Sequence, residues 1–124
     1  MYDKQGDVME SIVKQSLLYD FYGELLTEHQ RAVYEDAVFN DMSLGEIASE
    51  QGISRQGVHD LIKRCDKILS GYEEKLHLVE KFLLIKKNVQ EIDSILSVYE
   101  KQGQDPTEMA AQIRKISDLI IDEF

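Results

Sequence analysis

The apolar residues of this chain recur at steps of three and four, which is the period of a helix face and not the alternation of a half-buried strand. In the first such segment the apolar residues at helical rather than strand spacing include Ile12, Leu18, Tyr22, Leu25 and Leu26. The pattern predicts helices over residues 8–26, 28–39 and 44–51, and another from residue 55 onward. We therefore expect an all-α fold.

Polar signals mark where these helices begin. An Asp, Ser or Thr followed three residues later by Glu or Gln can satisfy the unpaired backbone donors of a first helical turn. Such pairs are Asp7 with Glu10, Thr27 with Gln30, Ser43 with Glu46, and Asp105 with Glu108. Ser54 predicts a fifth start, and Gly103 with Pro106 marks the break before the last helix.

Between Ser54 and Gly103 the sequence has no strong helix stop, although Gly71 could interrupt or bend the helix. Either one very long helix or two or three stacked pieces would fit this stretch. The last helix is expected to carry one apolar stripe: Met109, Ile113, Ile116, Ile120 and Phe124.

The length of 124 residues suits one domain with an appended arm. We predict a helix-turn-helix domain over residues 1–72 and a helical extension over residues 73–124. The apolar stripe from Tyr72 to Tyr99 is longer than a tri-helical unit needs, and this favours a symmetric homodimer formed by the extension. The alternative is a hairpin in which the last helix folds back to cover the stripe.

Charge is distributed unevenly. The chain has 24 acidic and 14 basic residues, for a net charge of -10, so it does not attract a polyphosphate as a whole. The segment from Ser54 to Tyr72 is the exception, with four basic and two acidic residues. Any contact with a nucleic acid must therefore be local.

That basic segment follows a tight joint with the spacing of a helix-turn-helix. Such a unit needs a small residue where the helices touch, a residue that tolerates a positive φ in the turn, and apolar anchors behind both helices. Ala48 is the expected contact and Gly52 the turn. The whole predicted scaffold is Ser43, Ile47, Ala48, Gly52, Ile53, Val58, Leu61 and Ile62.

The free face of the second helix is the candidate nucleic-acid site. Its expected members are Ser54, Arg55, Gln56, His59, Lys63 and Arg64. Ser54 caps the helix; Arg55 and Gln56 lie near base edges, and Lys63 and Arg64 contact phosphates. The alternative interpretation is that these charged residues only form a solvent-exposed helix face without a binding role.

The sequence gives little support for catalysis. His29, His59 and His77 fall on different segments without ligand spacing, and Cys65 falls at a core position. We expect no enzyme activity, no metal and no cofactor. The single cysteine, the absence of a visible signal peptide and the short apolar runs favour a cytoplasmic protein without membrane insertion.

The runs 20–30, 43–48 and 54–64 resemble the YlxM-like helix-turn-helix family of Gram-positive bacteria, a resemblance that covers residues 16–78. Residues 26–69 are also similar to region four of sigma factors, a tri-helical unit without a wing. The resemblance implies a small DNA-binding regulator, associated through gene neighbourhood with the signal recognition particle pathway of protein export.

A second function remains open from the residues alone. Four basic residues are few for a DNA-binding protein, and Asp60 and Asp66 offset part of their positive charge. The competing interpretation is an accessory module that binds protein or structured RNA of the signal recognition particle. A dimer would double the number of basic residues and favour the DNA-binding interpretation.

Overall fold

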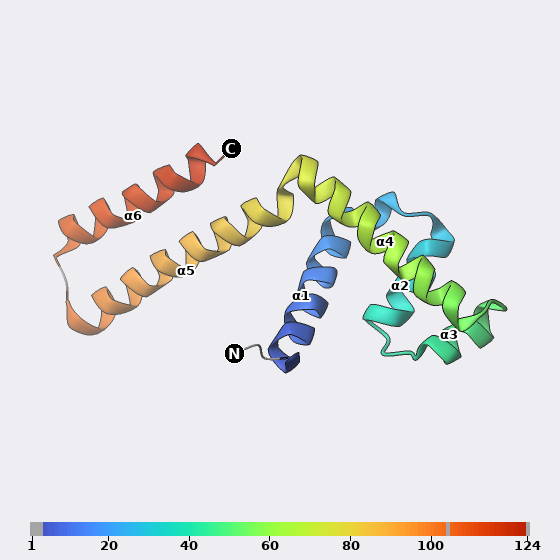
Figure 1. Ribbon diagram of the computed structural model, residues 1–124. Coiled ribbons are helices and arrows are strands. Elements are labelled where there is room, and N and C mark those ends of the chain that lie inside the picture. The colour runs from blue at the N-terminus through green and yellow to red at the C-terminus, as the bar shows by residue number, and fades with distance from the viewer. Residues whose placement is uncertain (1–3, 104, 124) are drawn as a thin grey trace. The chain divides into compact units, whose positions relative to one another are not determined.

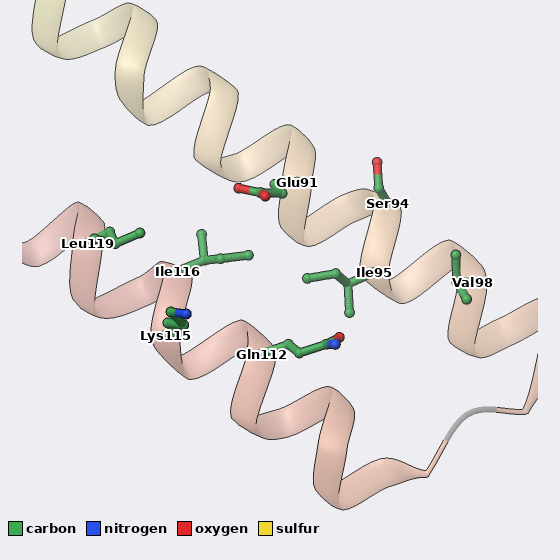
Figure 2. Close-up of a pocket in the computed structure, with 8 residues that line it drawn as sticks. All are labelled: Glu91, Ser94, Ile95, Val98, Gln112, Lys115, Ile116 and Leu119. Atoms are coloured by element: carbon green, nitrogen blue, oxygen red, sulfur yellow. The ribbon is translucent and has the colours of Figure 1, made fainter.

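The computed structural model describes residues 4–103 and 105–123, and for residues 4–11 it describes the backbone only. The described chain is helical throughout and contains no strand, which confirms the expected all-α fold. Figure 1 shows its elements: α1 (Lys4–Tyr22), the short 3-10 helix η1 (Gly23–Leu25), α2 (Glu28–Val38), α3 (Leu44–Gln51), α4 (Arg55–Leu76), α5 (Leu78–Gln102) and α6 (Pro106–Asp122). None of the described helices is both long enough and apolar enough to cross a bilayer.

Side-chain caps begin most of these helices where the sequence predicts. Thr27 and Gln30 form a complete capping box, because Gln30 N–H donates to Thr27 Oγ1 at 3.2 Å and Thr27 N–H to Gln30 Oε1 at 2.9 Å. Ser43 accepts from the amide of Glu46 at 3.1 Å, and Ser54 caps α4. These caps fix the starts of α2, α3 and α4.

Two of the predicted helix starts differ from those in the structure. Helix α1 begins at Lys4 rather than Val8, so Asp7 lies inside it; the side chains of Asp7 and Glu10 lie outside the described residues. Asp105 does cap α6, but its carboxylate accepts from the amide of Thr107 at 3.0 Å rather than from that of Glu108. An N-cap side chain can accept from either the second or the third amide of the helix, and Pro106 at the start has no donor that needs a partner.

The chain divides into two compact units, the first ending at Val79 and the second beginning at Glu80. The core of the first unit has two parts. One joins α1, α2 and α4 and is built from Leu18, Tyr22, Leu26, Tyr34, Cys65, Leu69 and Val79. The other joins α2, α3 and α4 and is built from Val33, Ile47, Ala48 and Val58. Leu61 and Ile62 pack against both parts, so α4 is the helix around which the unit is assembled.

A buried polar link ties three helices of the first unit together. The hydroxyl of Tyr34 donates to Asp66 at 2.6 Å, and the amide of Gln15 donates to the same carboxylate at 3.1 Å. Burial first, and then the hydrogen bond to the Asp66 carboxylate, raise the pKa of the Tyr34 hydroxyl. The link fixes α1 and α2 against the middle of α4.

The helix after Ser54 is interrupted at His77, which has a φ of 57°, and not at Gly71, which lies inside α4. The first amides of α5 find partners in the first unit: Leu78 N–H donates to the Tyr22 hydroxyl at 3.1 Å, and Val79 N–H donates to Glu73 Oε1 at 2.9 Å. The Tyr22 hydroxyl itself donates to Glu73 at 2.7 Å. These bonds hold the chain to the first unit beyond Tyr72, so the compact unit ends at Val79 and not at the expected boundary.

The second unit pairs α5 with α6 (Figure 1). Of the predicted α6 stripe, Ile116 is buried, and Met109, Ile113 and Ile120 are partly buried; Phe124 lies outside the described residues. In the single chain, α6 thus folds back along α5, as the hairpin alternative expects. Apolar side chains stay exposed on both helices nonetheless, among them Leu83, Val89 and Leu119.

Candidate nucleic-acid interface

Helices α3 and α4 form the predicted helix-turn-helix. Gly52 ends α3 in the left-handed conformation, with φ 68° and ψ 31°, and its amide donates to the carbonyl of Ala48. The amide of Ile53 donates to the same carbonyl at 3.1 Å. A residue with a Cβ would be strained at this φ, so glycine is what lets α4 start with only three residues between it and α3.

Most of the apolar residues that the sequence predicts behind the turn are buried or partly buried there. Ile47 and Val58 are fully buried, and Ala48 is nearly so, which lets the two helices approach closely. Ile53 is the exception, because its side chain is 38% exposed and is not a buried anchor. A Cβ built at Gly57 would lie 3.9 Å from Ile53 Cδ1, so Ile53 covers the first turn of α4 from outside.

Val33 of α2, which was not among the predicted scaffold residues, belongs to the core behind the turn. It is fully buried in the same cluster as Ile47 and Val58. The three-and-four spacing of Val33 within residues 28–39 is a signal that could have identified it, although spacing does not tell which helix packs behind the turn.

Ser54 and Arg55 lie at the entrance to α4. The Ser54 hydroxyl accepts from the amide of Gly57 at 2.9 Å, which caps the helix. Arg55 is exposed, and a Cβ built at Gly45 would lie 3.6 Å from its Nε atom. The guanidinium therefore lies beside Gly45, in the first turn of α3.

Gln56 and His59 are both engaged by Asp60. The amide of Gln56 donates to Asp60 Oδ1 at 3.0 Å, and His59 Nδ1 lies 3.8 Å from the same oxygen. His59 and Asp60 are 48% and 60% exposed, so this cluster lies on the solvent side of α4. The bond uses one of the two amide hydrogens of Gln56, which leaves one hydrogen and the carbonyl oxygen for another partner.

The remaining predicted cations, Lys63 and Arg64, are exposed in the middle of α4. With neighbouring polar side chains they line a shallow hollow of about 590 Å³ on the helix surface: Asp60, Lys63, Arg64, Asp66, Lys67 and Ser70. Lys67 and Ser70 were not among the predicted site residues. Their spacing of four and seven residues from Lys63 is the signal that could have added them.

Helix α3 is acidic where it reaches solvent, because Glu46 and Glu50 are exposed and the helix has no basic residue. Positive charge at the helix-turn-helix thus comes from α4 alone. The thiol of Cys65 contributes nothing to this surface: it is fully buried, and burial raises its pKa to about 11, so it is neutral at physiological pH.

Comparison with known proteins agrees with this geometry. The profile of the family UPF0122, described as "Putative helix-turn-helix protein, YlxM / p13 like", matches residues 9–115. A UPF0122 protein of Desulforamulus reducens is 45% identical over 98 residues, covering 79% of this chain and 83% of the relative. A Clostridium kluyveri relative is 48% identical over 96 residues, covering 73% and 83%. A Bacillus cereus AH187 relative is 37% identical over 109 residues, covering 88% and 99%.

Proposed function

Because the chain belongs to the UPF0122 family of YlxM / p13 like helix-turn-helix proteins, we propose that it is a DNA-binding regulatory protein that acts on transcription in the cytoplasm. The observation that carries the proposal is the exposed first turns of α4, held against α3 by the Gly52 turn. The major groove of B-form DNA admits an α-helix, and helix-turn-helix proteins insert the first residues of their second helix there.

Each side chain has a distinct role in this proposal. Arg55 donates to a guanine edge, and the free hydrogen and carbonyl oxygen of Gln56 pair with an adenine. Lys63 and Arg64 contact phosphates, which adds affinity without sequence preference. His59 lies between the two groups, and Ser54 fixes the start of the helix.

We further propose that two copies associate through the helical extension of residues 73–124, at the α5–α6 hairpin that forms the second unit. The α5–α6 hairpin leaves Leu83, Val89 and Leu119 exposed, and a two-helix hairpin has little core of its own. A symmetric dimer would present two recognition helices to two half-sites. Light scattering should give twice the chain mass of 14.3 kDa, and a mass near 14.3 kDa would contradict the dimer.

The acidic surface of α3 favours a second candidate. In a docked helix-turn-helix the first helix crosses the sugar-phosphate backbone, where Glu46 and Glu50 would repel phosphates. The alternative function is that of an accessory module that binds protein or structured RNA of the signal recognition particle and reads no DNA sequence.

Anisotropy titrations at several salt concentrations separate these functions. The proposal expects binding to duplex DNA that weakens steeply with log salt, and loss of affinity in Arg55→Ala and Lys63→Ala but not in Lys101→Ala, a matched change in the second unit. Tighter binding to the particle's RNA than to any duplex would favour the alternative. If Arg55→Ala and Lys63→Ala bind every nucleic acid as the unchanged protein does, the assigned face is wrong.

A further inference from the structure

The outer face of α4 continues beyond the residues that can reach base edges. Gln56, Lys63, Lys67 and Ser70 follow one another at steps of seven, four and three residues, so they share one stripe of the helix. All four are polar or charged, and all are exposed. The buried residues of α4, Val58, Cys65 and Leu69, lie on the opposite side.

Helix geometry sets the length of this stripe. At a rise of about 1.5 Å per residue, Ser70 lies about 21 Å along the axis from Gln56. Helix-turn-helix proteins contact base edges with the first residues of the second helix, and a straight helix leaves the curving major groove farther along, so Lys67 and Ser70 lie beyond the bases that the first turn meets. These two residues can meet only the sugar-phosphate backbone that borders it.

The charges in the hollow favour an anion there. Asp66 accepts hydrogen bonds from Tyr34 and Gln15, and Asp60 accepts one from Gln56, so both acids are engaged by donors of this chain. Within the part of the chain that the structure describes, Lys63 and Lys67 form no ion pair. Two ammonium groups one helical turn apart, with a hydroxyl three residues farther, thus face solvent in a hollow whose three basic side chains outnumber its two acidic ones.

We propose that Lys63, Lys67 and Ser70 form a phosphodiester-binding track on α4, which holds the backbone of the duplex whose bases meet the start of the same helix. The inference rests on the proposed DNA-binding function and adds Lys67 and Ser70 to it. In this arrangement α4 has two parts: its first turns discriminate between sequences, and its middle anchors the helix to any duplex.

Anisotropy titrations of Lys67→Gln and Ser70→Ala against random-sequence duplex DNA test the track. Lys67→Gln should lower affinity about fivefold near physiological salt and reduce the slope of log affinity against log salt by about one. Ser70→Ala removes a hydrogen bond but no charge, so affinity should fall about two- to tenfold with an unchanged slope. Lys101→Gln, which removes the same charge from the second unit, is the matched control.

The track fails if Lys67→Gln and Ser70→Ala bind duplex as Lys101→Gln does while Arg55→Ala is impaired, an outcome that leaves the proposed function intact. If the unchanged protein binds no duplex, the proposed function fails, and amide chemical shifts then test the track with inorganic polyphosphate. Shifts confined to residues 63–70 would support it, and their absence would overturn it. Preference for a hairpin RNA, with the same loss in Lys67→Gln, would contradict duplex DNA as the ligand.

Discussion

At the scale of single residues, Asp60 modifies what the recognition helix can do. It holds the Gln56 amide at 3.0 Å and lies beside His59, so a negative charge sits among the groups assigned to a polyanion. Such a carboxylate weakens contact with any phosphate but can accept from a cytosine amino group. Under the proposed function, this arrangement would lower general affinity for phosphates and favour discrimination between sequences.

The change Asp60→Asn should therefore raise affinity for random-sequence duplex about two- to fivefold, equivalent to about 0.5–1 kcal/mol for an exposed charge. The gain should shrink as salt is added, because added ions screen the repulsion. Anisotropy titration against the same duplex measures the effect, and Asp93→Asn in the second unit is the control. Equal or weaker binding by Asp60→Asn would show that phosphates do not approach this residue.

Tyr34 supplies a prediction about stability. It is fully buried and donates to Asp66 at 2.6 Å, so Tyr34→Phe removes a hydrogen bond to a charged acceptor that is itself only partly exposed. We expect a loss of about 1.5–3 kcal/mol in the free energy of unfolding, measured by urea denaturation. Tyr72→Phe is the control, because no hydrogen bond to its hydroxyl occurs among the described residues, and it should cost less than about 0.5 kcal/mol.

At the scale of elements, two glycines in and before α4 behave in opposite ways. Gly71 lies inside the helix, and an added Cβ would meet no atom within 4 Å, so Gly71→Ala should stabilise the protein by about 0.5–1 kcal/mol. Gly52 also has open space, but its φ of 68° strains any other residue, so Gly52→Ala should destabilise by about 1–2 kcal/mol. Thermal denaturation measures both changes, and a shift of the same sign in the two variants would contradict the assigned backbone conformations.

The joint between α4 and α5 is also decided at this scale. His77 turns the chain with a φ of 57°, and the two following amides bond to Tyr22 and Glu73. The first two amides of α5 thus receive hydrogen-bond partners from α1 and α4. This explains why the break occurs at His77, whereas Gly71, the residue with the weaker helix propensity, continues the helix.

At the scale of the whole molecule, several hydroxyl and thiol groups with raised pKa values make stability depend on alkaline pH. Burial and the bond to Glu35 raise the pKa of Tyr19 from 10.0 to about 12, and burial raises that of Cys65 from 9.0 to about 11. Burial likewise raises the pKa of Tyr22 and Tyr34. As pH rises, these groups therefore stay protonated in the folded state at pH values at which they have lost their protons in the unfolded state.

Stability should accordingly be complete below about pH 9 and fall as pH rises through about 11 to 12, because the unfolded state then binds fewer protons than the folded one. Urea denaturation at a series of pH values measures the decline. Tyrosinate absorbance and helical circular dichroism should change together as the protein unfolds. Titration of all six tyrosines near pH 10 without loss of helix would contradict the prediction.

The division into two units gives a prediction about truncation. A chain ending at Val79 keeps the Glu73 bond to Tyr22 and the buried Val79 side chain, whereas a chain ending at Tyr72 loses both. The shorter chain should be less stable by about 3 kcal/mol, from one buried aliphatic side chain and an unpaired hydroxyl. Urea denaturation of the two truncated chains compares them directly, and equal stability would place the end of the first unit before Glu73.

The sequence by itself determined the helical class, the starts of α2, α3 and α4, and the turn at Gly52. These features are local: a cap at Thr27, Ser43 or Ser54 needs a donor within three residues, and a positive φ needs only the absence of a Cβ. The outward face of α4 was equally readable, because helical spacing separates its polar positions from Val58 and Leu61.

Only the tertiary structure decided that Ile53 is exposed, that Val33 packs behind the turn, and that Asp60 accepts a hydrogen bond from Gln56. The same is true of the boundary at Val79, which depends on the Tyr22 hydroxyl, 56 residues before the amide of Leu78 to which it bonds. Spacing tells which positions share a face of one helix, but not which helix covers that face. That depends on how side chains from distant segments fill one core, and only packing in three dimensions determines it.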